Sequence, residues 1–162
     1  MNKLKCAIIG LGHQAIGDHI PGLKDSQFAQ LEAVCDVDEE KVNELKKELG
    51  VRGYKDYKEL FDSEKLDFVI IVTPHDVYRE IIEEATKRHI HILKEKPFAR
   101  NLKEAIYLKN LCDKSGIVMM TTLQRRFNPI YNTFFQLKDQ IGEPFFIDAK
   151  YTIFVNNPHK GW

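Results

Sequence analysis

Short apolar segments alternate with amphipathic ones along the first 122 residues, and this order constrains the fold more than any other feature. The apolar segments occupy residues 4–9, 31–36, 66–74, 90–93 and 117–123, and helical patterns fill most of the chain between them. The run Phe68–Val72 is apolar throughout, as in central parallel strands that are covered on both faces. This order predicts an α/β fold, a doubly wound parallel sheet of Rossmann type with helices on both faces and right-handed crossovers.

The composition is that of a globular domain without a charge bias. The 162 residues are 43% hydrophobic and 30% charged, with 24 basic and 24 acidic side chains. A neutral chain has no global electrostatic reason to bind nucleic acid or an anionic membrane, and no window approaches 18 consecutive apolar residues. Cys6, Cys35 and Cys112 lack metal-ligand spacing, so we interpret them as small buried hydrophobes in a reducing cytoplasm. We therefore expect no nucleic-acid partner, no membrane span and no metal.

The pattern changes near residue 122. Residues 128–142 have helical character, and residues 145–155 then alternate with a period of two, which predicts a strand with one buried face. A lone strand has no sheet to join, and isolated strand pairs are marginal. We therefore expect residues 1–122 to form one domain. Residues 123–162 would be the truncated start of a second, α+β domain with a mainly antiparallel sheet, serving substrate binding and oligomerisation.

The first chemical motif follows the first apolar segment. Gly10-x-Gly12-x-x-Ala15 matches the dinucleotide-binding pattern, in which the first glycine allows a tight turn, the second admits a pyrophosphate and the small third residue lets helix and sheet pack closely. Asp36 ends the second apolar segment, where a carboxylate accepts hydrogen bonds from the adenosine ribose. The alternative is a nucleotide-free turn in a doubly wound fold. The cofactor contacts expected here come from Gly10, Gly12, His13, Gln14, Ala15 and Asp36.

The acidic residue also bears on the choice of cofactor. A carboxylate at Asp36 repels a 2′-phosphate, and the following residues, VDEEK, offer no arginine to hold one. NAD is therefore expected rather than NADP, although Lys41 keeps NADP open.

The segment HILKEKPFAR, residues 91–100, places charges at the end of an apolar strand and then fixes the backbone with Pro97. Read alone, it could be a solvated strand end. With AIIGLGHQA, VCDVD, VIIVTPHDVY and QRRFNP in the same order, however, it resembles the N-terminal part of the Gfo/Idh/MocA oxidoreductases, the glucose–fructose oxidoreductase and inositol dehydrogenase superfamily. The resemblance covers nearly all of residues 4–130.

The resemblance implies a catalytic role for the Glu95-Lys96-Pro97 signature. Lys96 would bind near the substrate hydroxyl beside the nicotinamide and help its proton leave or return. Burial and crowding would lower the proton affinity of this amine, as general acid–base chemistry requires. Glu95 would orient Lys96 or contact the cofactor ribose. The resemblance also implies that the Lys96–Pro97 peptide is cis.

Further carry-overs extend to other segments. Thr73 and Pro74 close the central strand and would lie along the cofactor. The family often has His where this chain has Tyr78, so no role is assigned to that residue. Arg125 would reach cofactor or substrate, or else form a surface salt bridge, and Trp162 matches a tryptophan that touches the nicotinamide region in some members.

Together these features predict an NAD(P)-dependent oxidoreductase, with NAD preferred, that transfers a hydride between nicotinamide and a secondary alcohol of a sugar, sugar acid or polyol. The family's substrate-side histidine would fall beyond Trp162, so we expect this chain to bind the cofactor but to turn over little. The full-length protein would be a homo-oligomer through its second domain. Two alternatives remain, a non-catalytic NAD-sensing regulator of the same fold and a stand-alone nucleotide-binding module.

Overall fold

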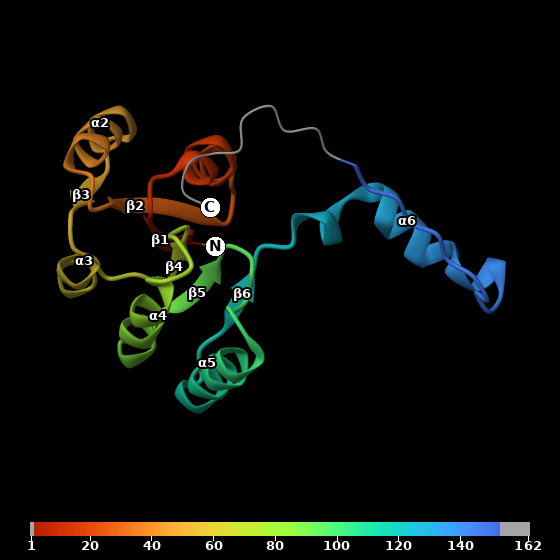
Figure 1. The fold of residues 1–162 in the computed structure, drawn as a ribbon. Coiled ribbons are helices and arrows are strands. Elements are labelled where there is room, and N and C mark those ends of the chain that lie inside the picture. Colours follow the sequence, from red (N-terminus) through yellow and green to blue (C-terminus); the bar gives the residue numbers. More distant parts are fainter. Residues whose placement is uncertain (1, 153–162) are drawn as a thin grey trace. The chain divides into compact units, whose positions relative to one another are not determined.

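Six parallel strands form a single sheet in a computed structural model that describes residues 2–152. The strand order is β3-β2-β1-β4-β5-β6, so the chain winds outward from β1 to one side and then from β4 to the other (Figure 1). This is the doubly wound Rossmann arrangement, and the predicted fold class is confirmed. The strands are β1 (Leu4–Ile9), β2 (Ala29–Cys35), β3 (Arg52–Tyr54), β4 (Phe68–Ile71), β5 (His91–Lys94) and β6 (Met119–Thr121).

Helices cover both faces of the sheet, because each central strand is apolar on both sides. Ile9 and Ile71 point into a core shared with α3, α4 and α5, whereas Ile8 and Ile70 point into a core shared with α1 and α2. Figure 1 shows α2 on one side of the sheet and α4 and α5 on the other. The helices are α1 (Ile20–Lys24), α2 (Glu39–Leu49), α3 (Tyr57–Ser63), α4 (Tyr78–Lys87) and α5 (Leu102–Ser115).

A wider π turn, η1 (Ala15–His19), leads into α1. Pro21 has no N–H to bond back to Gly17, and a proline ring crowds the carbonyl four residues before it, which favours a wider turn at this point. Such single π turns are frequent at functional sites.

The short edge strand β3 (Arg52–Tyr54) does not appear among the apolar segments of the sequence. It has three residues, and its centre is Gly53. A Cβ atom added at Gly53 would lie 2.7 Å from Cγ1 of Val42 in α2. The glycine that hides the strand in the sequence is therefore what lets α2 pack closely against it.

A second unit of the chain begins at Gln124. It contains η2 (Gln124–Phe127), α6 (Pro129–Leu137) and η3 (Lys138–Ile141), which confirms the helix expected over residues 128–142. The predicted strand at 145–155 is not formed in its described part, residues 145–152, and residues 153–155 lie outside the described range. A strand needs a hydrogen-bonding partner, and this unit supplies none among its described residues.

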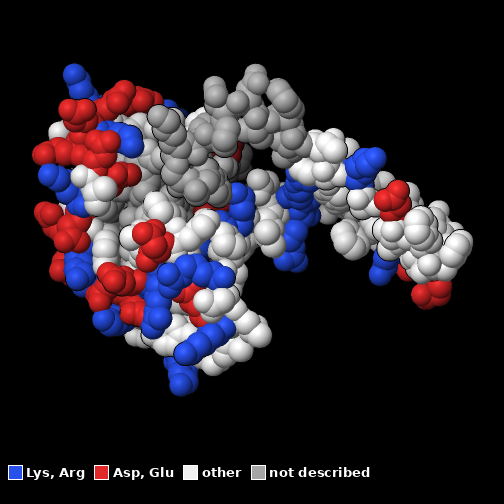
Figure 2. All heavy atoms as spheres, in the orientation of Figure 1, with Lys and Arg blue, Asp and Glu red and all other residues white. Residues whose placement is uncertain are grey.

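Large apolar side chains cover much of α6. In Figure 2 acidic and basic side chains are interspersed over the first unit, whereas most of α6 is uncharged. Its exposed apolar residues are Ile130, Tyr131, Phe134, Phe135 and Leu137.

The three cysteines are free and buried. Burial raises the pKa of Cys6 and of Cys35 to about 12, and it also raises the pKa of Cys112. Among the described residues, no helix has the length and apolar character needed to cross a bilayer. In the same part of the chain, no cluster of His, Cys, Asp or Glu side chains could hold a metal ion.

Candidate functional site

The predicted site residues of the first unit gather at one edge of the sheet. All strands are parallel, so their carboxyl ends share an edge, and ligands of open α/β sheets bind at that edge where the strand order reverses. Here the reversal lies between β1 and β4. The predicted residues that follow these carboxyl ends are Gly10, Gly12, His13, Gln14, Ala15, Asp36, Thr73, Pro74, Glu95 and Lys96.

The two glycines of the loop after β1 serve different purposes. Gly10 has φ +93°, and a Cβ there would lie 2.6 Å from the Val72 carbonyl oxygen, so the fold itself requires this glycine. Gly12 is exposed, and a Cβ there would meet no atom within 4 Å. The space beside Gly12 is open to a ligand, while Ala15 is fully buried in the core next to the sheet. This arrangement fits a pyrophosphate at the start of the following helix.

Asp36 ties the ends of two strands together. One carboxylate oxygen accepts the N–H of Leu11 at 2.6 Å, and the other accepts the N–H of Asp38 at 2.9 Å. Each carboxylate oxygen has a second lone pair, so both can still accept a ribose hydroxyl. Asp36 therefore orders the glycine loop in addition to the ribose contact that its position predicts.

The segment after Asp36 is unfavourable for the 2′-phosphate that distinguishes NADP from NAD. Its cation, Lys41, lies 3.3 Å from Asp38, and Glu39 lies 2.9 Å from Lys55. Because Lys41 is already engaged by a carboxylate, it is less available to a 2′-phosphate. The local charge favours NAD over NADP.

A contact across the edge joins the helix after β1 to the turn after β5. His19, at the end of the π turn, lies with Nε2 2.9 Å from Oε1 of Glu95, and both side chains are largely buried. The other Glu95 oxygen accepts the backbone N–H of Lys96 at 3.2 Å. Glu95 is thus held on both sides. No sequence motif pointed to His19, because its partner Glu95 lies 76 positions further along the chain.

Three threonine hydroxyls at this edge are buried without a hydrogen-bond partner in the described structure. Thr73 follows β4, and Thr121 and Thr122 stand at the end of β6, so they flank the end of β5. A buried hydroxyl without a partner costs free energy unless a ligand or water satisfies it. The orphaned Thr73 hydroxyl fits the predicted cofactor contact, whereas Thr121 and Thr122 were missed because Thr is common at strand ends.

The turn after β5 confirms one expectation and corrects another. The Lys96–Pro97 peptide is cis, as predicted. Lys96 is exposed, however, so the burial expected of this amine is absent. That burial falls on Lys94, because alternate residues of a strand face the same side and Lys94 follows the buried Ile92 into the core.

Two of the predicted site residues, Arg125 and Trp162, belong to the second unit. Arg125 lies in η2, with its guanidinium carbon 4.4 Å from the centroid of the Tyr151 ring of the same unit. Trp162 lies outside the described residues.

Comparison with known proteins supports the fold of the first unit. The Gfo/Idh/MocA family model, described as an oxidoreductase family with an NAD-binding Rossmann fold, matches residues 4–123. The chain belongs to the Gfo/Idh/MocA oxidoreductase family. Its first unit is therefore the NAD-binding Rossmann domain of a Gfo/Idh/MocA protein.

Similar proteins include dehydrogenases of two bacteria. The chain is 31% identical to a myo-inositol 2-dehydrogenase of Thermotoga maritima, over 85% of this chain and 40% of that protein. It is 28% identical to a D-apiose dehydrogenase of Paraburkholderia graminis, over 98% of this chain and 44% of that protein. The chain thus spans less than half the length of these relatives.

A solved structure shares the fold closely. It is an oxidoreductase from Agrobacterium radiobacter in complex with NAD+, L-tartaric acid and magnesium. The TM-score is 0.83 at 29% identity, and the match covers 89% of this chain and 43% of the other.

This Gfo/Idh/MocA domain contains a buried polar network beneath the Glu95-Lys96-Pro97 turn. Lys94 is 2% exposed, and its ammonium donates to the carbonyl oxygens of Glu95 at 2.8 Å and Pro97 at 2.6 Å. Its nitrogen also lies 3.7 Å from the centroid of the Tyr78 ring. Desolvation lowers the pKa of Lys94 to about 8, against the opposing attraction of Glu104 and Glu95.

Tyr78 and Glu104 complete this network. The Tyr78 hydroxyl donates to Glu104 at 2.7 Å, and Arg100 donates to the same carboxylate through its backbone N–H and its guanidinium, each at 2.8 Å. Burial, reinforced by Glu104, raises the pKa of Tyr78 to about 12, while Arg100 lowers the pKa of Glu104 to about 2. The period-two spacing of Ile92 and Lys94 was the one signal in the sequence for this buried lysine.

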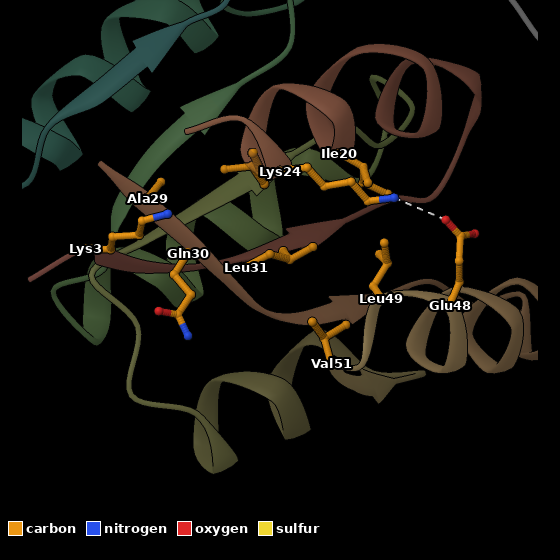
Figure 3. A pocket seen from close by; sticks show the side chains of 10 residues that line it. Lys3, Ile20, Lys24, Ala29, Gln30, Leu31, Glu48, Leu49 and Val51 are labelled. Carbon is orange, nitrogen blue, oxygen red and sulfur yellow. Dashed lines mark hydrogen bonds and ion pairs between the residues drawn. The ribbon is translucent and has the colours of Figure 1, made fainter. Parts of the chain in front are cut away.

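A hollow of about 260 Å³ lies elsewhere, between α1, α2 and the start of β2. Figure 3 shows its lining, which includes Leu31, Leu49 and the ion pair of Lys24 with Glu48 at 3.2 Å. Lys3 and Ala29, at the amino ends of β1 and β2, also line it. It therefore opens at the sheet edge opposite the glycine loop and is separate from the candidate site.

Proposed function

We propose that the protein containing this chain is an NAD-dependent oxidoreductase that transfers a hydride between nicotinamide and a secondary alcohol or ketone carbon. The proposed substrates are a sugar, a sugar acid or a polyol. Membership of the family and the likeness to the D-apiose and myo-inositol dehydrogenases support this class. The whole activity is a proposal because the chain spans less than half the length of those relatives.

The observation that carries the proposal is the exposed Lys96 at the sheet edge that also bears the glycine loop and Asp36. When bound, NAD supplies the hydride acceptor, and the protein supplies position and a proton path. Gly12 leaves room for the pyrophosphate, and Asp36 accepts the ribose hydroxyls. The Thr73 hydroxyl is available to the same cofactor.

Lys96 is the proposed proton-handling residue. In ketone reduction the Lys96 ammonium would donate a proton to the carbonyl oxygen as the carbon receives hydride, and in alcohol oxidation the neutral Lys96 amine would accept the hydroxyl proton. Glu95, fixed between His19 and the Lys96 backbone, would orient this amine or meet the cofactor ribose.

The second unit is proposed to begin the substrate-binding and oligomerisation domain. The exposed apolar side chains of α6 support this, because contiguous exposed apolar surface marks an interface. The proposed setting is the reducing cytoplasm, which three free cysteines support.

The test uses the full-length protein and a panel of polyols, sugars and sugar acids, and NAD reduction is followed by the absorbance of NADH. Lys96→Ala is expected to lower kcat by ~10³-fold while NAD affinity, measured by calorimetry, changes by less than ~3-fold. Turnover unchanged by Lys96→Ala would end the catalytic assignment. NAD binding without turnover of any panel member would favour the NAD-sensing regulator instead.

A further inference from the structure

We propose that Lys94 is a positioning residue that holds the Lys96 turn in its active geometry from inside the core. This inference rests on the proposed role of Lys96 as the proton-handling residue. Lys94 lies two residues before the lysine of the Glu95-Lys96-Pro97 signature and is not part of it.

The first argument is the choice of acceptors. The Lys94 ammonium donates to the carbonyls of Glu95 and Pro97, the residues directly before and directly after Lys96. One nitrogen therefore fixes the backbone before and after the proposed catalytic residue. Because the position of a side chain follows its backbone, these two hydrogen bonds restrict where the Lys96 amine can lie.

The second argument is burial. With 2% of its surface exposed, Lys94 cannot itself reach a substrate or cofactor. The strand pairing explains its depth, since Lys94 lies between Ile71 of β4 and Thr121 of β6. Any effect of Lys94 on catalysis must pass through the turn that it holds.

The third argument is the enclosure of the charge. The Tyr78 ring from α4 lies against the ammonium, and Glu104 from α5 holds the hydroxyl of that ring. Glu95, on the turn itself, is the other carboxylate acting on Lys94. A buried charge is weak support for stability compared with an apolar residue of similar size, so a role in geometry accounts better for its presence.

The test is a double-mutant cycle in the full-length protein, with Lys94→Met and Lys96→Ala made singly and together. Met removes both donated hydrogen bonds and keeps an unbranched side chain of similar length. We expect Lys94→Met to lower kcat by ~10²-fold, the typical effect of a ~1 Å misplacement, with the KM of the alcohol and the NAD affinity within ~3-fold. In the Lys96→Ala background the same change is expected to lower kcat by less than ~2-fold, because the residue it positions is gone.

A second readout does not depend on activity. Hydrogen exchange of the peptide covering residues 95–100 is expected to rise at least ~10-fold in Lys94→Met, while exchange in β1 and β4 stays the same. A residue that only stabilised the fold would raise exchange throughout the domain. Lys109→Met, at an exposed lysine of α5 paired with Asp113, is the matched control and should leave kcat and exchange unchanged.

The outcomes separate this inference from the proposed function. An equal loss of kcat in both backgrounds, or no loss in either, overturns the positioning role. If Lys96→Ala alone has no effect on kcat, the proposed role of Lys96 fails. If hydrogen exchange at residues 95–100 is also unchanged in Lys94→Met, Lys94 does not hold the turn. Should Lys94→Met not fold, Lys94→Gln takes its place, since it keeps two N–H donors on a side chain one atom shorter. Its expected loss is ~10-fold, absent again when residue 96 is alanine.

Discussion

At the ends of β2 and β5, a single charged side chain fixes the turn that follows the strand, but the two charges are opposite. After β2, the Asp36 carboxylate gathers the backbone N–H groups of Leu11 and Asp38. After β5, the Lys94 ammonium gathers the backbone carbonyls of Glu95 and Pro97. In both places one side chain fixes a turn at the edge of the sheet where the cofactor is expected.

The difference between the two ends lies in exposure. Asp36 is partly exposed, so one carboxylate can both order its loop and meet a ligand. Lys94 is sealed beneath Tyr78, so ordering and ligand contact are divided between Lys94 and the exposed Lys96. A buried residue at the end of a strand can order the turn that follows, but it cannot also contact a ligand. At the end of β5 the ligand contact is therefore left to Lys96, two residues further along the chain.

The largest effect is expected from Asp36→Ala. The change removes the proposed ribose acceptor and frees the Leu11 N–H, so the NAD dissociation constant should rise by ~10²-fold, as for loss of charged hydrogen bonds. Discrimination against NADP should fall as well, because the repelling carboxylate is gone. Calorimetric titration with each dinucleotide measures both effects.

Asp56→Ala is the control for this change. Asp56 accepts the Lys58 N–H at the start of α3, so its loss should cost about 1 kcal/mol of stability and leave NAD affinity unchanged. Equal preference of the unmodified protein for NAD and NADP would show that the role given to Asp36 in cofactor choice is wrong.

A smaller effect is expected from the pH dependence of stability at the β5 end. The pKa of Lys94 falls from 10.5 to about 8 in the fold, so the unfolded chain binds more protons between these values and stability contributed at this site rises with pH. From pH 7 to 9.5 the unmodified protein should gain about 2 kcal/mol relative to Lys94→Met. Denaturation by urea at stepped pH measures the difference.

Neighbouring titratable groups do not obscure the effect of Lys94 between pH 7 and 9.5. Tyr78 and Glu104, which face Lys94 from α4 and α5, have pKa values near 12 and 2, outside the window. The buried thiols of Cys6 and Cys35 act in the opposite direction above pH 9, but they are common to both proteins and cancel in the difference. A difference that stays flat with pH would show that Lys94 is not desolvated.

The smallest effect is expected at the opposite edge of the sheet. Lys24→Ala removes an ion pair with Glu48 in which both side chains are 57% exposed, so stability should change by less than about 0.5 kcal/mol. NAD affinity should be unchanged, because the hollow beside Lys24 lies away from both turns. A clear loss of NAD affinity in Lys24→Ala would show that the cofactor contacts the sheet edge opposite the glycine loop, which contradicts the proposed site.

Most of the first unit could be predicted from its sequence because local and global signals agree there. Apolar runs such as Phe68–Val72 specify buried parallel strands, and Gly10 and Gly12 mark the one turn that such a sheet needs for a dinucleotide. The edge strand β3 was not predicted because its central Gly53 is required by close packing against Val42 of α2, and no local sequence pattern indicates that contact.

The candidate site was predicted in part, and the misses have a common cause. Gly10, Asp36 and Glu95 belong to short motifs, whereas His19, Tyr78 and Glu104 act through partners at least 26 positions away in the chain. The strand expected over residues 145–155 shows the same limit, since alternation specifies a face and not a partner to pair with.

The buried cysteines have a practical consequence for measuring motion at the cofactor edge. With their thiols enclosed and their pKa values raised, Cys6, Cys35 and Cys112 hold little thiolate at neutral pH and should resist maleimides in the folded protein. A single cysteine introduced at Val37, which is 87% exposed beside Asp36, would then take a fluorophore alone. The native sequence thus provides a background in which dinucleotide arrival can be followed optically without first removing any residue.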